Sequence, residues 1–230
     1  RRRPMSRQEG PRSRRGEGST AHLALALALA LAPALTLSLV LALPGLCAAQ
    51  EFHVDRRADN LVRFISRASV EEFEGVTERI DGYVRLDAAT LTPGSAGGST
   101  EIWLEVDLAS LDTGIGLRNR HMRDRYLETA KHPFATFRGA IVRSEADPAG
   151  ASRVTARGTL TIHGVARPRD LTCRVEPRGP GYRALCAFEV LLSAHDIEIP
   201  KVMFLKLANE ISLELDFAIT PARPPNGDAR

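Results

Sequence analysis

The chain has 230 residues, with 31 Lys and Arg against 28 Asp and Glu, so its formal net charge is +3. Residues 1–49 hold seven arginines and two glutamates, and they contribute +5, which leaves residues 50–230 with a net charge of −2. The basic character belongs to the first segment alone, so the composition argues against a nucleic-acid partner for the rest of the chain.

The first segment has the three-part composition of a secretory signal. An arginine-rich stretch, residues 1–20, precedes residues 21–49, which carry no charge and consist mainly of Leu and Ala. Small residues just before position 50 are typical of a cleavage site, so residues 1–49 are predicted to be a signal peptide cleaved after Ala49. An uncleaved anchor is the alternative, because the uncharged stretch is long enough to span a bilayer. The mature protein is therefore predicted to be periplasmic or secreted.

Residues 50–220 have about the size of one domain, and much of this region alternates between apolar and polar residues. A period of two is the pattern of half-buried antiparallel strands. The strands are expected at residues 51–55, 61–67, 82–87, 100–108, 135–143, 153–163, 165–175, 182–192 and 209–220. Strands this numerous need a sandwich or a closed barrel to remove their edges, and alternation alone leaves both open.

Turn and helix signals divide these strands. His163-Gly164 is expected to form a two-residue hairpin turn, and residues 178–181 form the tip of another hairpin. One helix is expected over about residues 117–128. The Pro-rich residues 221–230 are expected to be a disordered tail.

Three segments, in this order and spacing, resemble the YceI-like family of bacterial envelope proteins. They are Ser110 to Gly114, Arg118 to His121 followed by His132 to Phe137, and Gly158 to Val165 with Pro168 close behind. The resemblance implies an all-β fold, a single antiparallel lipocalin-like barrel with one short inserted helix, over residues 50–220. It also implies an elongated apolar cavity, because family members bind polyisoprenoids or other long-chain amphiphiles. One departure is Asn119, since the family often has Asp at that place.

The expected function is therefore non-covalent binding of a long apolar molecule, such as an isoprenoid or a fatty-acid derivative. The inward side chains expected to line the cavity are Ile102, Leu104, Val106, Phe137, Leu160, Ile162, Phe188, Ile211, Leu213 and Leu215. Small inward residues, Ala156, Gly158 and Ala184, are expected to leave room between them. Arg118 and His121 are expected at the cavity mouth, near a polar headgroup; the alternative is a helix face that is simply solvated.

A different class of function stays open beside this one. A small barrel can be filled by its own side chains, and the protein would then be a ligand-free structural or interaction module of the cell envelope. An internal cavity is the observation that separates the two. The sequence leaves a monomer and a homodimer both open.

No enzymatic chemistry, cofactor or metal is expected. Asp112-Thr113-Gly114 matches the triplet of aspartic proteases, but that mechanism needs two such carboxylates and the chain has one copy. A connection from strand to helix, in which Asp112 or Thr113 accepts hydrogen bonds from backbone N–H groups, is the expected role. His121, His132, His163 and His195 lack metal-ligand spacing with each other or with the cysteines, which predicts no metal site.

Cys173 and Cys186 are expected to form a disulfide. If residues 178–181 form the hairpin tip, Pro177 faces Tyr182, and counting outward then places Cys173 opposite Cys186. Directly opposed residues bring their Cβ atoms close to disulfide distance, and an exported protein meets an oxidising compartment. Two buried thiols are the alternative.

Overall fold

The computed structural model describes residues 49–67, 72–86, 91, 94, 100–148, 150–199, 201–202, 205–206 and 208–222. The predicted signal peptide, apart from Ala49, and the predicted tail beyond residue 222 lie outside the described residues. No helix in the described part of the chain is long and apolar enough to cross a lipid bilayer.

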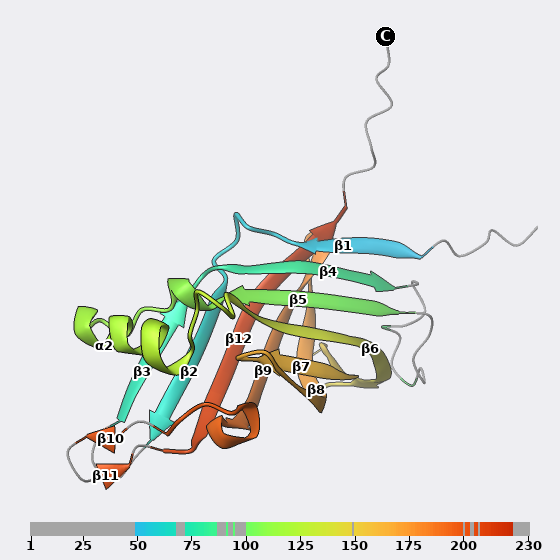
Figure 1. The fold of residues 1–230 in the computed structure, drawn as a ribbon. Helices are drawn as coiled ribbons and strands as arrows, with labels where there is room; N and C mark the ends of the chain where they lie inside the picture. Colours follow the sequence, from blue (N-terminus) through green and yellow to red (C-terminus); the bar gives the residue numbers. More distant parts are fainter. Residues whose placement is uncertain are drawn as a thin grey trace, which may run out of the picture. The chain divides into compact units, whose positions relative to one another are not determined.

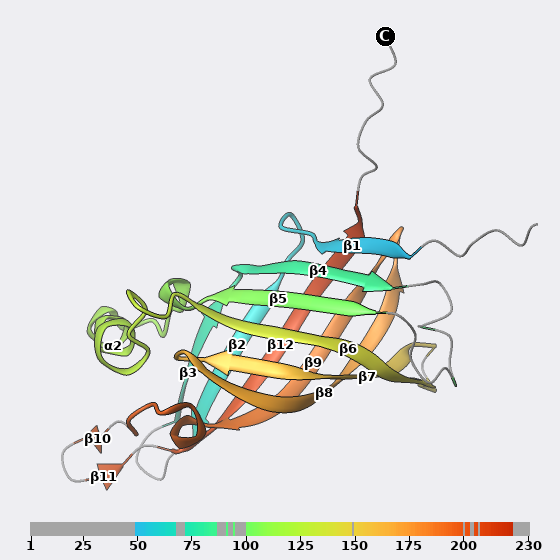
Figure 2. The same cartoon turned by 45° about the vertical axis from the view of Figure 1, so that its right-hand side comes forward.

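Eight antiparallel strands form a closed barrel (Figures 1 and 2). In their order around the barrel they are β1 (Gln50–Val54), β4 (Ile80–Leu86), β5 (Glu101–Asp107), β6 (Phe134–Ala146), β7 (Ser152–Ile162), β8 (Val165–Arg178), β9 (Gly181–Leu191) and β12 (Glu210–Pro221). Strand β1 pairs with both β4 and β12, which closes the ring. The predicted fold class is confirmed, and closure decides for a barrel over a sandwich. Strand β12 extends to Pro221, which pairs with Phe52, so the prediction of a disordered tail was wrong at its first residue.

Two further strands extend the wall at one end of the barrel. The first part of β12 pairs with β2 (Leu61–Arg67), whereas its last residues pair with β1. Strand β2 also pairs with β3 (Glu72–Thr77), which sequence reasoning missed. Alternate positions of β3 carry Glu72 and Glu74, so it looks polar in sequence. A small hairpin joins β10 (Lys201–Val202) to β11 (Leu205–Lys206).

The helical segments lie at the same end of the barrel as the β2–β3 extension (Figures 1 and 2). They are η1 (Leu108–Ser110), α2 (Gly116–His121), η2 (Met122–Tyr126) and η3 (Leu192–His195). The expected helix over residues 117–128 therefore forms, as an α-helix that continues into one π-helical turn. It connects β5 to β6.

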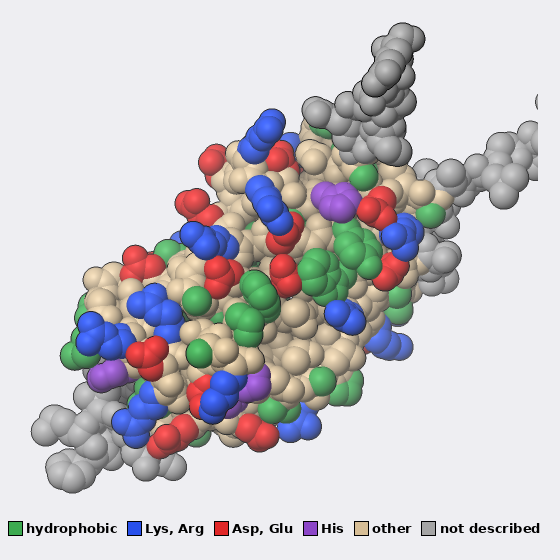
Figure 3. Space-filling view, turned by 45° about the horizontal axis from the view of Figure 1, so that its top comes forward, with side chains coloured by type: hydrophobic (Ala, Val, Ile, Leu, Met, Phe, Trp, Pro, Cys, Tyr) green, Lys and Arg blue, Asp and Glu red, His purple; other side chains and the backbone are tan. Residues whose placement is uncertain are grey.

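The inner and outer faces of the wall differ as the alternation predicts. The inward faces supply the buried apolar core, whereas the outer face carries ion pairs such as Arg157 with Asp170 and Arg85 with Glu51 and Glu101. Figure 3 shows acidic and basic side chains interspersed over one side of this outer face. Exposed pairs of this kind contribute little to stability, so the free energy of folding comes mainly from the inner face.

The hairpin of β8 and β9 has the register derived from its turn. Pro177 faces Tyr182, Val175 faces Ala184, and Cys173 faces Cys186. The two cysteine sulfur atoms are bonded, and their Cα atoms lie 4.3 Å apart. A covalent link therefore joins two neighbouring strands of the barrel wall.

Candidate ligand-binding cavity

The barrel encloses a cavity of about 550 Å³ that is lined almost wholly by apolar side chains. Its volume falls within the range of about 300–1,000 Å³ that is typical of ligand pockets. All ten inward residues singled out from the sequence lie on its wall: Ile102, Leu104, Val106, Phe137, Leu160, Ile162, Phe188, Ile211, Leu213 and Leu215. Several of them, including Leu104 and Leu213, are only half-buried, because one side of each packs on the core and the other faces the cavity.

The small inward residues divide into two kinds. Ala156 and Ala184 line the cavity, so their short side chains leave room there as expected. Gly158 does not: it faces Gly139 on β6, and a Cβ on Gly158 would lie 2.1 Å from the carbonyl oxygen of Arg138. The expectation that Gly158 leaves cavity volume was therefore wrong. The glycine pair instead allows two strands of the wall to approach closely.

The cavity reaches the surface at the helical end of the barrel. Ile115, Leu117 and Leu191 line it, yet 49%, 60% and 45% of their surfaces are exposed. Arg118 and His121 of α2 also lie on the lining at this end. The Arg118 guanidinium stacks over the Phe73 ring, 4.3 Å from its centre, which places a cation beside the opening.

A network of hydrogen bonds holds the connection from β5 to α2. The Asp112 carboxylate accepts from the Gly114 N–H at 2.8 Å and from the Asn119 amide at 2.6 Å, and Asn119 first and Gly114 second lower the pKa of Asp112. The amide oxygen of Asn119 accepts from both the backbone and the hydroxyl of Thr113. Asp112 thus has the predicted structural role. An amide suits position 119 because it donates and accepts at once.

Two buried polar side chains lie on the cavity wall although the sequence analysis did not predict them there. Ser66 is 1% exposed, and its hydroxyl has no hydrogen-bond partner among the described residues. His195 is 3% exposed, and its Nδ1 lies 3.0 Å from the carbonyl oxygen of Val165. The signal for Ser66 was present, because it follows Val62 and Phe64 at the inward positions of β2. His195 lies in a connection without alternation, which offers no such signal.

A family comparison agrees with this architecture. The family model described as the YceI-like domain matches residues 52–219. The chain belongs to the YceI-like family. Among relatives in this family, a UPF0312 protein of Azotobacter vinelandii is 29% identical over 147 residues, which are 61% of this chain and 71% of the relative. Protein YceI of Salmonella newport is 26% identical over 143 residues, which are 61% of this chain and 69% of that protein.

Solved structures share the YceI-like fold with this chain. BcnA of Burkholderia cenocepacia superposes with a TM-score of 0.58 at 22% identity, covering 72% of this chain and 98% of BcnA. A polyisoprenoid binding domain from Saccharophagus degradans, implicated in plant cell wall breakdown, gives a TM-score of 0.55 at 18% identity. That match covers 74% of this chain and 98% of the domain. At these identities the likeness establishes the fold.

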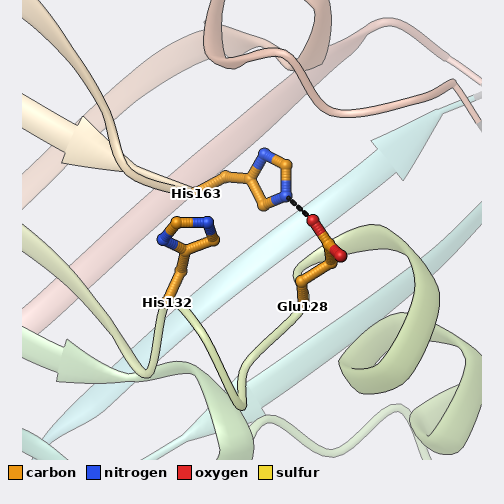
Figure 4. A group of neighbouring side chains, drawn as sticks. All are labelled: Glu128, His132 and His163. Atoms are coloured by element: carbon orange, nitrogen blue, oxygen red, sulfur yellow. Dashed lines mark hydrogen bonds and ion pairs between the residues drawn. The ribbon is translucent and has the colours of Figure 1, made fainter.

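A second group of side chains lies outside the cavity lining of this YceI-like barrel. Glu128, which follows η2, meets His132 and His163, and their potential ligand atoms all lie within 4.8 Å of one another (Figure 4). His163 occupies the predicted hairpin turn between β7 and β8. The prediction of no metal site rested on the spacing of His and Cys in the sequence. It overlooked Glu128 and the chain reversal that brings position 163 beside position 132.

Proposed function

We propose that this protein is exported and holds a long apolar molecule, isoprenoid or fatty-acyl in character, inside the barrel without changing it chemically. Membership of the YceI-like family supports a binding role, and a neighbour of the same fold is a polyisoprenoid binding domain. The residues that the structure describes on the cavity wall include no carboxylate and are almost all apolar, which suits a hydrocarbon chain.

The cavity itself is the observation that carries this proposal. A filled barrel would need its inward side chains to meet in the middle, whereas here a space of about 550 Å³ remains between them. Each CH₂ group transferred from water into such a space contributes roughly 0.8 kcal/mol before the entropic costs of binding. A long chain therefore gains affinity with length until the cavity is filled.

The position of the opening determines how the proposed ligand would be oriented in the cavity. Its apolar chain fits the aliphatic wall, and its polar group would lie at the helical end, where Arg118 and His121 stand beside the opening. Ser66 adds a buried hydroxyl that has no partner among the described residues, and it is suited to a hydroxyl, carbonyl or amide of the ligand. Arg118, already stacked on Phe73, contributes orientation more than affinity.

The decisive test is extraction of the ligand. Protein purified from its own host envelope should release one apolar long-chain molecule per chain into organic solvent, identified by mass spectrometry. Leu104→Arg places a charge on the cavity wall and should abolish both the extracted molecule and the uptake of a fluorescent fatty-acid analogue. Thr159→Arg is the matched control, because Thr159 is exposed on the outer face of β7 and its replacement leaves the cavity unchanged.

Two results would overturn the binding role. One is the consistent absence of any stoichiometric apolar molecule together with no uptake of the analogue by the folded wild type. The other is equal uptake by the wild type and Leu104→Arg. Either would favour the ligand-free envelope module. Native mass spectrometry of the same sample distinguishes a monomer from a homodimer.

Export is tested separately. The mature protein should be recovered from the periplasm or medium, and its N-terminal residue should be Gln50, because the segment before it has the composition of a cleaved signal. An N-terminus at Met5 on the recovered protein would contradict cleavage after Ala49.

A further inference from the structure

Three side chains from two parts of the chain converge beside the cavity mouth. Glu128 follows η2, His132 precedes β6, and His163 lies in the turn between β7 and β8 (Figure 4). We propose that these three side chains form a binding site for Zn²⁺ or a chemically similar divalent transition metal. The site is independent of the apolar ligand, because Glu128, His132 and His163 lie outside the cavity lining.

The donor set suits such a metal. Two imidazoles and one carboxylate are common ligands of Zn²⁺, and three protein ligands leave one position for water. With bonds of about 2.1 Å, a tetrahedral ion spaces its donor atoms about 3.4 Å apart. Glu128 Oε2 and His163 Nε2 already lie 3.1 Å apart. The His132 ring centre lies 4.9 Å from that of His163, and the potential ligand atoms of all three residues lie within 4.8 Å of one another, so His132 would have to turn toward the ion on binding.

Hydrogen bonds outside the group orient two of its ligands. His163 Nδ1 lies 3.2 Å from the carbonyl oxygen of His195, and because a carbonyl only accepts, Nδ1 carries the hydrogen. The other ring nitrogen, Nε2, then faces Glu128 Oε2. Two lone pairs would repel at this distance unless a cation, either a proton or a metal ion, lies between them. A backbone carbonyl that fixes the tautomer of a histidine is the usual support of a metal ligand.

The carboxylate is also arranged for a single bond to the metal. Lys131 pairs with Oε1 of Glu128, which leaves Oε2 facing His163. The His163 side chain is 12% exposed and that of Glu128 is 34% exposed, so water competes only partly for these atoms.

The backbone at two of these positions is unfavourable for the residues found there. Glu128 has φ of 44° and His163 has φ of 53°, both in the left-handed region that favours glycine. A residue with a Cβ costs about 1–2 kcal/mol in this conformation. Position 164, beside the group, also favours glycine, because a Cβ there would lie 2.6 Å from Cε1 of His132. Residues held in this region are often found at functional sites, so these two conformations add support to the geometry of the group.

The position of the proposed metal site allows a bound ion to link several segments at the cavity mouth. Leu127, next to Glu128, lines the cavity, and so does His195, whose carbonyl oxygen holds His163. A bound ion would tie the helical segment, the start of β6 and the β7–β8 turn together at the mouth. Metal binding should therefore raise the thermal stability of the protein, whatever the apolar ligand is.

The test is metal titration of the full chain, purified without a histidine tag and treated with a chelator. Calorimetry with ZnCl₂ should give one ion per chain, and CoCl₂ should give the intense visible absorption of a tetrahedral or five-coordinate site. His163→Asn keeps a residue that tolerates the left-handed turn but removes the ligand, and Glu128→Gln keeps the shape but removes the charge. Each should weaken Zn²⁺ binding by more than about 100-fold.

The chain offers a matched control and a variant that separates structure from binding. His53→Ala removes a histidine whose Nε2 lies 2.7 Å from Glu51 in the same kind of pair, but without a second histidine, and it should leave Zn²⁺ binding unchanged. Glu128→Gly should raise the melting temperature without metal and abolish its increase with Zn²⁺. If the folded wild type binds no stoichiometric Zn²⁺, the proposal is overturned, and His163 and Glu128 form only an ion pair. Equal losses in His53→Ala and His163→Asn would also overturn it.

Discussion

The two ends of the cavity are built by different means. Toward the β8–β9 turn its wall is made of side chains from regular strands, such as Val175, Ala184 and Phe217, and the Cys173–Cys186 disulfide forms part of it. At the helical end, polar side chains join the wall, and Arg118 and His195 come from segments outside the barrel strands. The strand-built end gives stability and a uniform apolar surface. Under the proposed function, the polar groups at the helical end would supply the directional contacts to the ligand.

Removing the disulfide tests the first half of this comparison and should have the largest effect. The double variant Cys173→Ala with Cys186→Ala opens a loop with a sequence separation of 13, and the free energy of unfolding should fall by about 3 kcal/mol. Urea unfolding under oxidising conditions measures it. Lipid-analogue binding by the folded fraction should change much less, since the polar contacts lie at the other end. An unchanged unfolding midpoint would show that the bond contributes nothing to stability.

Asn119→Asp tests the hydrogen-bond network behind the mouth. The new carboxyl group would face Asp112 instead of donating to it, so the melting temperature at pH 7 should fall by on the order of 5 °C. Repulsion raises the pKa of one of the two carboxyls in the folded state. The variant is therefore fully destabilised at a pH above that raised pKa. The destabilisation disappears as the pH falls below the pKa values near 4 that both carboxyls have in the unfolded chain. Thermal melts from pH 3 to pH 7 check this. A deficit that does not depend on pH would contradict the repulsion and leave a steric cause.

The wild-type network has its own pH dependence. The pKa of Asp112 is lowered by Asn119 and Gly114, so this carboxylate stabilises the fold above its unfolded pKa and loses that contribution as the pH falls through its folded pKa.

Ser66→Ala sharpens the comparison by separating stability from ligand recognition. The hydroxyl has no partner among the described residues, so its removal should leave stability unchanged or increase it by about 1 kcal/mol. Binding of a ligand with a hydroxyl or amide should weaken about fivefold, whereas binding of a pure hydrocarbon should not. Fluorescence titrations with such a matched pair of ligands measure the difference. Equal losses for both ligands would indicate a change in shape instead.

Arg118→Gln should have the smallest effect. Loss of the stacking on Phe73 and of a cation beside the opening should weaken binding of an anionic lipid analogue about two- to fivefold. Arg120→Gln is the control, because Arg120 lies on the same helix and is exposed outside the cavity lining. A loss of a hundredfold or more would assign Arg118 a direct ion pair with the ligand.

The barrel strands were predictable because alternation is a local pattern. Every barrel strand expected from the sequence is present, and counting from the turn at residues 178–181 gave the register that opposes Cys173 to Cys186. Strand β3 was missed because its glutamates make the segment look polar in the sequence. Those glutamates face the arginines of β2, with Glu74 beside Arg63 and Glu72 beside Arg67, and only the pairing explains them.

The site was less predictable because it depends on contacts between distant segments. Inward apolar residues can meet or leave a space, and the width of the closed barrel decides which, so alternation alone could not predict a cavity. The group of Glu128, His132 and His163 combines two nearby residues with one from a different hairpin. The spacing of these residues along the chain therefore does not indicate that they lie close together in the fold. The hydrogen bond from His163 to the His195 carbonyl likewise depends on how η3 folds back over the mouth.

The position of β12 in the chain has a consequence for the time course of folding. This strand joins the barrel on both sides, and it brings Phe52 of the first strand against Pro221 of the last. The ring cannot close until residues 210–221 have left the ribosome, so the inner face of the growing chain has no native cover before then. Contacts so distant in sequence also make folding slow, in the range of milliseconds to seconds. A chain with these properties stays unfolded long enough to be engaged by chaperones, and a nonsense mutation before β12 would leave an unclosed sheet that is prone to aggregate.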